Sequence, residues 1–228
     1  MKTNCPFTLT EYRSLIRLAR SRFQIVDYHD YSRHDSFIIW RHDVEYSLAE
    51  MSILAAIDAE EGMQATFFLQ LHSETYNFWS REVVDQVMEW LRAGHRLGLH
   101  FDANYYGIKD SQDLEDLIQK EQRILEEIYE TRITAFAYHS PTPAILGCQD
   151  NYAGLVNTYN TDFFGGKIIY VSDSNGRWRD RTQPHRDQPT GPRAARYLAA
   201  QAERTVGAGA LARSGRSSAR DRALGAPG

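Results

Sequence analysis

Phe37-Ile38-Ile39-Trp40-Arg41-His42-Asp43-Val44-Glu45 is the stretch that decides the fold of this chain. Four apolar residues run directly into a segment of mostly ionisable side chains. An apolar run of this kind is typical of a parallel strand that is covered on both faces. Open α/β sheets and α/β barrels keep their chemistry at the carboxyl ends of such strands. The stretch therefore predicts a buried strand that ends at a site built from His, Asp and Glu.

Strand-like and helix-like segments alternate along most of the chain. We expect Ser80 and Ser111 to cap two of the helices, and Gly62 and Gly94 to end two. The expected helices cover residues 9–20, 47–61, 81–93 and 111–129, and the expected strands cover residues 23–26, 37–40, 65–71, 97–100, 133–138 and 167–171. This alternation predicts a parallel sheet with right-handed crossovers. About seven units would curl into a barrel and about five would stay an open sheet, and the pattern alone leaves both possible.

The composition of the chain changes after Arg179. Residues 180–228 contain nine Arg and four acidic residues, are rich in Ala, Gly, Pro and Ser, and lack Lys, Ile, Phe, Trp, Met, Asn and Cys. No apolar period of a helix or strand continues there. We therefore expect one domain over residues 1–179, truncated at its end, and a tail over residues 180–228. The tail is interpreted either as a disordered basic segment or as the product of a reading-frame shift near residue 179.

Charge and cysteine content restrict the partners and the compartment. The whole chain has a net charge of −4, and residues 1–179 carry 17 basic and 26 acidic residues, so their net charge is −9. An acidic body argues against nucleic acid as a partner. Cys5 and Cys148 form no zinc motif or disulfide framework, which indicates a reducing compartment. No stretch approaches the ~18 apolar residues of a membrane span. We expect a cytoplasmic protein, and the sequence does not indicate its oligomeric state.

Polar and ionisable side chains follow the expected strands. They are, in chain order, Arg41, His42, Asp43 and Glu45; His72; His100, Asp102 and Asn104; His139 and Ser140; and Asp173, Arg177 and Trp178. The carboxyl ends of parallel strands lie at one edge of the sheet, so these side chains are expected to converge on one mouth. Of these residues, a lone His such as His72 is more often a hydrogen-bonded loop residue than a ligand.

Asp43 and Glu45 are the pair that points to a metal ion. At positions i and i+2 of an extended segment, their side chains lie on the same side. Two carboxylates on one side repel each other unless a cation lies between them. A divalent metal would let one carboxylate bind while the other accepts a proton. His100 would add a nitrogen ligand, and such a set suits Zn²⁺ or another first-row metal.

Five segments, in this order, resemble the polysaccharide deacetylase (NodB-homology) superfamily, which is carbohydrate esterase family 4 in the wide sense. The resemblance is strongest to the branch of WbmS-like proteins from bacterial surface-polysaccharide clusters. The matching segments are Arg41–Glu45, Gly62–Phe68, Gly94–Asp102, Phe136–Pro141 and Tyr170–Arg179. Together they cover roughly residues 20–179 of the chain.

The resemblance implies a fold, a reaction and roles for particular residues. The fold is an α/β one, a distorted, incomplete (β/α) TIM-like barrel. The reaction is the metal-dependent removal of an acetyl group from an N-acetylated sugar. Carried over by motif, Asp43 is the catalytic base, and Glu45 and His100 bind the metal. The other residues of the predicted mouth are expected to contact substrate: Arg41, His42, Asn104, Ser140, Asp173, Arg177 and Trp178.

The chain departs from the family pattern at two places. Asn104 stands where the family has its second metal-binding His, so we expect Asp102 or His139 to complete the metal site. The late motif that carries the catalytic acid His should follow residue 179 and is absent, which agrees with a truncated domain. Glu45 is also one methylene longer than the usual Asp, which displaces its carboxylate by up to ~1 Å, and errors of that size are costly in enzymes.

Three functions are compatible with these features. The first is a deacetylase that acts on an N-acetylated sugar or glycan precursor in the biosynthesis of a surface glycan such as lipopolysaccharide. The second is a non-catalytic relative that binds sugar through the rim residues Tyr105, Tyr106, Arg177 and Trp178. The third is a different metal-dependent hydrolase with a similar barrel, because rim residues alone do not specify the bond that is cleaved.

Overall fold

The computed structural model describes residues 8–109, 111, 113–164, 168–172, 179–180 and 198–201. In chain order its elements are α1 (Leu9–Arg20), β1 (Gln24–Ile25), a 3-10 turn (Tyr31–Arg33), β2 (Phe37–Val44), α2 (Leu48–Glu60), β3 (Ala65–Leu69), α3 (Arg81–Arg92), β4 (Arg96–Phe101), α4 (Leu114–Tyr129), β5 (Ala135–Tyr138), α5 (Pro143–Leu146), β6 (Val156–Asn157), α6 (Thr161–Phe164), β7 (Ile169–Ser172), β8 (Arg179–Asp180) and β9 (Leu198–Gln201). The expected alternation of helices and strands is therefore present.

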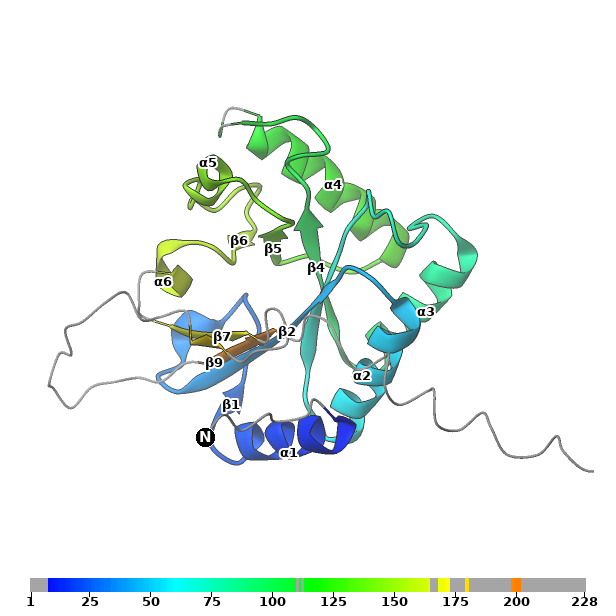
Figure 1. Cartoon of the computed structure of the whole chain (residues 1–228), viewed down its shortest axis with the longest axis vertical. Helices are drawn as coiled ribbons and strands as arrows, with labels where there is room; N and C mark the ends of the chain where they lie inside the picture. Colours follow the sequence, from blue (N-terminus) through cyan, green and yellow to red (C-terminus); the bar gives the residue numbers. More distant parts are fainter. Residues whose placement is uncertain are drawn as a thin grey trace, which may run out of the picture.

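The described strands form one curled sheet with the order β6-β5-β4-β3-β2-β9-β7-β8, and β1 pairs with β2 outside this path. All of these pairs are parallel except β7 with β8. Figure 1 shows α1, α2, α3 and α4 following one another around the outside of the sheet. The architecture is an α/β half-barrel, compatible with the incomplete TIM-like barrel that was predicted.

Alternation along β2 separates two hydrophobic cores. Ile38, Trp40 and Val44 face outward into the larger core, which lies between the sheet and the helices. Phe37 and Ile39 face inward, where they pack in the smaller core with Phe68, Ala135 and Ala137 of neighbouring strands. Because successive strand residues point to opposite faces, the polar residues at odd positions of β2 face the barrel interior, and those at even positions face the helices.

Local signals explain most of the element boundaries. The side chains of Ser47 and Ser80 accept hydrogen bonds from the backbone N–H groups of Glu50 and Val83, so both residues cap helices. Ser111 does not cap α4, contrary to the prediction. Its carbonyl oxygen accepts a bond from the N–H of Leu114, which makes a turn, and the helix begins only at Leu114.

Gly98 permits the close packing of β3 against β4. It lies opposite Phe68 in the register of the two strands. A Cβ atom at this position would lie 2.5 Å from the Phe68 ring, far inside a normal carbon–carbon contact. The glycine two residues before His100 therefore lets the Phe68 ring lie flat across β4 inside the barrel.

The segment predicted to be a structureless tail contributes one strand. Residues Leu198–Gln201 form β9, which pairs with both β2 and β7. These four residues lie in the segment interpreted as a disordered tail or as the product of a reading-frame shift, and they pair because the open edge of β2 provides unpaired backbone groups that a short extended segment satisfies. The predicted domain boundary at residue 179 thus excludes one strand of the sheet.

Candidate metal site at the carboxyl edge of the sheet

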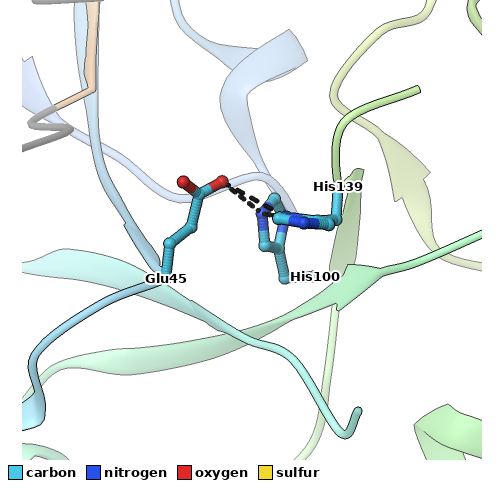
Figure 2. Close-up of side chains that lie close together, drawn as sticks. All are labelled: Glu45, His100 and His139. Carbon is cyan, nitrogen blue, oxygen red and sulfur yellow. Dashed lines mark hydrogen bonds and ion pairs between the residues drawn. The ribbon is translucent and has the colours of Figure 1, made fainter. Parts of the chain in front are cut away.

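Three side chains from three strand ends meet at the carboxyl edge of the sheet. Glu45 follows β2, His100 belongs to β4, and His139 follows β5. One carboxylate oxygen of Glu45 lies 3.1 Å from Nε2 of His100 and 3.3 Å from Nδ1 of His139. The two ring nitrogens are 3.2 Å apart. Figure 2 shows the carboxylate pointing at both imidazole rings, so the three donor atoms share one small space.

Strand pairing places these three residues together. His100 lies opposite Ala137 in the β4–β5 register, so His139 emerges just beyond the end of β5. The N–H of His139 donates to the carbonyl oxygen of Phe101 at 2.8 Å, which holds this turn against β4. The backbone just before Glu45 is held from the next loop, since the hydroxyl of Tyr76 donates to the carbonyl oxygen of Val44 at 3.1 Å.

The three side chains of the cluster shift one another's pKa values. Burial alone would raise the pKa of Glu45, but hydrogen bonds from His100 and His139 outweigh it and hold that pKa well below its ordinary value. The pKa of His139 is raised, because its hydrogen bond to Glu45 and the Glu45 charge outweigh the effect of burial. The ionised form of Glu45 and the protonated form of His139 thus stabilise each other.

A divalent metal fits this donor set. One ligand atom from each of Glu45, His100 and His139 lies within 4.8 Å of the other two. Two imidazole nitrogens with one carboxylate oxygen form a common first-row metal set that leaves further coordination positions open. Glu45 and His100 were predicted as ligands by motif, and His139 was one of two candidates for the third. The structure brings all three together.

The other candidate, Asp102, has a different role. Its carboxylate accepts hydrogen bonds from the backbone N–H groups of Asn104 and Tyr105 at 2.9 and 3.3 Å, and from the side chain of Gln70 at 3.4 Å. These bonds fix the turn after β4. Asp102 is absent from the cluster that the described residues form, although its charge contributes to raising the pKa of His139.

Asp43 lies inside the barrel in a buried ion pair with Arg41. Both oxygens of its carboxylate accept hydrogen bonds from Arg41, at 2.7 to 3.1 Å, and Asp43 is only 3% exposed. Arg41 also donates to the hydroxyl of Thr158 and lies over the Phe68 ring, with 4.9 Å from Cζ to the ring centroid. Burial would lower the pKa of Arg41, but the Asp43 charge outweighs it and raises that pKa.

His42 points away from the mouth. It lies on the outward face of β2, fully buried beneath α1 and α2. Its Nε2 is 2.8 Å from a carboxylate oxygen of Asp58 and 3.2 Å from the hydroxyl of Tyr12, which also accepts a bond from Trp40. The predicted substrate contact at His42 is therefore wrong, because its even position along β2 turns the ring to the helix-covered side.

Asn104 and Ser140 connect two loops of the mouth. The side-chain amide of Asn104 donates to the carbonyl oxygen of Ser140 at 3.0 Å. Ser140 has a φ of +40°, a left-handed conformation that non-glycine residues adopt mainly at turns and functional sites. Both residues are exposed next to the metal cluster, where substrate contact is possible. Asp173, Arg177 and Trp178, the remaining predicted contacts, lie outside the described residues.

Sequence reasoning missed a second polar cluster at the same edge. His72, which follows β3, has its Nε2 3.0 Å from the hydroxyl of Tyr106 and 3.1 Å from a carboxylate oxygen of Glu121. The available signal was Glu121 itself, which lies three residues after Ile118 and four before Leu125 on the buried face of α4. A carboxyl group within an apolar helical stripe indicates a functional or paired group.

Another group of potential ligands lies elsewhere in the structure. One ligand atom from each of Asp27, His29 and Asp30 lies within 4.8 Å of the others. A carboxylate oxygen of Asp27 is already 2.6 Å from the guanidinium of Arg96, the first residue of β4. This group therefore lies at the amino end of β4 and takes no part in the mouth.

No family model matches this chain, and a search of curated proteins finds no match. Among the described residues, none of the helices combines the length and the apolar character that crossing a membrane requires.

Proposed function

We propose that this chain is a metal-dependent hydrolase that removes the acetyl group from an N-acetylated sugar, with Glu45, His100 and His139 as the metal ligands. One observation carries the proposal. Three ionisable side chains, each from a different strand end, place their donor atoms within 4.8 Å of one another at the carboxyl edge of a parallel sheet. α/β barrels hold their active sites at this edge.

Two further features support the deacetylase class. Five sequence segments resemble the polysaccharide deacetylase motifs in order, and the curled half-barrel is compatible with an incomplete TIM-like barrel. The third ligand in this proposal is His139, which takes over from the His that the family has at the position of Asn104. His139 is 24% exposed and within 3.2 Å of His100, so this replacement needs no rearrangement of the backbone.

In the proposed reaction, the metal and the residues around it have separate roles. A bound divalent metal would polarise the amide carbonyl and make a water molecule more acidic. Asp43 would accept the proton of that water, and Arg41 would hold the Asp43 carboxylate in place and balance its charge inside the barrel. Asn104 and Ser140, which are exposed beside the cluster, would contact the sugar.

A non-catalytic sugar-binding protein is the second candidate. The observation that favours it is the engagement of both Asp43 oxygens by Arg41, since a base must have a lone pair directed at its proton. Trp79 and Tyr105, which are 64% and 59% exposed, lie on loops that follow β3 and β4. Aromatic rings at such positions could stack on a sugar without any reaction.

Elemental analysis of the purified protein tests the metal site. We expect a single Zn²⁺ or other first-row ion per chain in the wild type. Glu45→Ala, His100→Ala and His139→Ala should each weaken binding by more than the ~10–100-fold that loss of a ligand's hydrogen-bond partner costs. Asp102→Asn is the matched control and should retain the ion. Equal metal loss in Asp102→Asn and His139→Ala would show that the ligands are assigned wrongly.

Acetate release tests the reaction. The metal-loaded protein should release acetate from N-acetylglucosamine oligosaccharides or from a nucleotide-linked N-acetyl sugar, and Asp43→Asn should abolish this release while keeping the metal. Metal binding and sugar binding without acetate release would support the non-catalytic candidate. Release from other acyl amides but from no acetylated sugar would indicate a different hydrolase.

A further inference from the structure

The cluster of His72, Tyr106 and Glu121 is a second ionisable group at the mouth of the barrel. His72 comes from the loop after β3, and Tyr106 comes from the loop after β4. The strand β3 lies between β2 and β4, which carry Glu45 and His100. The charge of Asp102 acts on both His72 and His139. His72 therefore lies at the same edge of the sheet as Glu45, His100 and His139 and is not part of their cluster.

The carboxyl group of Glu121 is buried, and burial of a carboxyl group costs free energy unless the group is paired or protonated. It lies on the buried face of α4 and is 1% exposed. Burial raises its pKa to about 7, and the charge of Asp102 adds to this effect, while Tyr106 and Lys120 oppose it. A pKa in this range suits a group that exchanges protons near neutral pH.

The geometry directs a proton of Glu121 to one atom of His72. The hydroxyl of Tyr106 donates to the Glu121 oxygen that faces His72, at 2.7 Å. Nε2 of His72 is 3.1 Å from the same oxygen. The His72 ring is stacked on the ring of Tyr105, with centroids 3.5 Å apart and planes within 5°. Among the described residues, the ring nitrogen of His72 that contacts Tyr106 and Glu121 is Nε2, which leaves Nδ1 for substrate.

We propose that His72 donates the proton to the leaving nitrogen of the amide, and that Glu121 resupplies His72 through Nε2. This inference rests on the proposed hydrolase function. As the C–N bond breaks, its electron pair stays on nitrogen, which takes the proton of Nδ1. Nε2 takes the proton of the Glu121 carboxyl group, whose O–H bond breaks to leave a carboxylate. Nε2 later returns that proton to Glu121, while water supplies a new proton to Nδ1. His72 would thus supply the acid that the missing late motif does not.

A comparison of two substrates by metal-loaded protein tests this role. The amide bond of an N-acetylglucosamine oligosaccharide needs a proton on its leaving nitrogen, whereas 4-nitrophenyl acetate releases a stable phenolate without one. His72→Gln should slow acetate release from the amide by roughly 10²–10⁴-fold, the usual contribution of a general acid, and leave ester hydrolysis and metal content unchanged. His29→Gln, which alters an exposed His outside the mouth, is the control and should change neither rate.

The pH profile gives a second measurement on a variant with the same shape. The wild-type rate on the amide should fall as pH rises through about 7, because Glu121 then loses its proton. Glu121→Gln cannot titrate, so its amide rate should be low and should lack this fall. An equal loss of amide and ester hydrolysis in His72→Gln, or an unchanged pH profile in Glu121→Gln, would overturn the inference. A wild type that hydrolyses neither substrate would overturn the proposed function instead.

Discussion

Glu45 is the residue on which the candidate metal site of Glu45, His100 and His139 depends. Its carboxylate is the only anion among the three donors, and both imidazoles turn a nitrogen toward one of its oxygens. In the structure the hydrogen bonds of the imidazoles stabilise this charge, and they lower the pKa of Glu45 while that of His139 rises. A metal would replace the proton on His139, so metal binding should release protons and tighten as pH rises.

The Glu45–His139 pair predicts a pH window of stability in the metal-free protein. A carboxyl group with a lowered pKa stabilises the fold above its unfolded value of 4.5, and this contribution is lost as pH falls through the folded pKa. A His with a raised pKa stabilises the fold below its unfolded value of 6.5, and loses this contribution as pH rises through the folded pKa. Both contributions are complete between these two values.

We therefore expect Glu45→Gln to destabilise the metal-free protein most within this window. The loss in the free energy of unfolding should be about 1.5–3 kcal/mol, as for a hydrogen bond to a charged group. It should shrink at alkaline pH, where His139 is neutral in both proteins. Thermal unfolding of both proteins across the pH range measures this difference. A difference that stays constant with pH would contradict the ion pair.

At the scale of elements, strand β2 serves two sites at once. Its inward positions hold Arg41 and Asp43 in the barrel, and its outward positions hold His42 against the helices. The alternation of a strand allows three consecutive polar residues to be buried, because Arg41 pairs with Asp43 on the inward face while His42 pairs with Asp58 on the outward face. The segment Arg41–Glu45 thus connects α1 and α2 to the barrel, and it also forms part of the mouth.

The network on the outward face predicts a stability effect without a functional one. Asp58 is fully buried and accepts hydrogen bonds from the hydroxyl of Tyr12 and from His42. Asp58→Ala should lower the free energy of unfolding by about 1–3 kcal/mol for each buried polar group left unsatisfied. His42→Leu together with Asp58→Ala should cost less than the sum of the single changes, since the residues are in contact.

Denaturant unfolding measures these costs, and metal content provides the control. Both single variants should keep the metal stoichiometry of the wild type, because His42 lies on the face of β2 opposite to the mouth. A folded His42→Leu protein that has lost its metal would contradict the separation of the two faces.

At the scale of the whole molecule, β9 closes the sheet on the side of β2 that β3 leaves open. It is hydrogen-bonded to β2 along one edge and to β7 along the other. Without it, β7 and β8 would lack a described link to the rest of the sheet. Four residues from the segment rich in Arg, Ala and Gly thus connect β2 to β7 within the half-barrel.

A proline within β9 tests whether this strand forms. Proline cannot donate to a ladder and is excluded from central strands. Ala199→Pro should therefore lower the midpoint of thermal unfolding, whereas Ala199→Ser, which keeps the backbone N–H, should not. If both variants unfold at the wild-type temperature, residues 198–201 do not pair with β2 in solution, and the interpretation of residues 180–228 as a tail is restored.

The sequence by itself determined most of the elements and two members of the candidate metal site, Glu45 and His100. Local apolar periods and the capping residues Thr8, Ser47 and Ser80 specify α1, α2 and α3, and the run of apolar residues before Arg41 specifies β2 as a buried parallel strand. Since parallel strands share one polarity, their carboxyl ends had to share one edge, and Glu45 and His100 followed from that.

The tertiary structure alone decided which side chains meet. The choice of His139 over Asp102 depends on the β4–β5 register and on the turn in which the Asp102 carboxylate accepts backbone hydrogen bonds. The exclusion of His42 depends on which face of β2 the helices cover, and the pairing of His72 with Glu121 depends on how α4 packs behind two loops. The strand β9 forms because β2 and β7 leave backbone groups to pair. Contacts between residues far apart in the chain are set by packing, which no local pattern encodes.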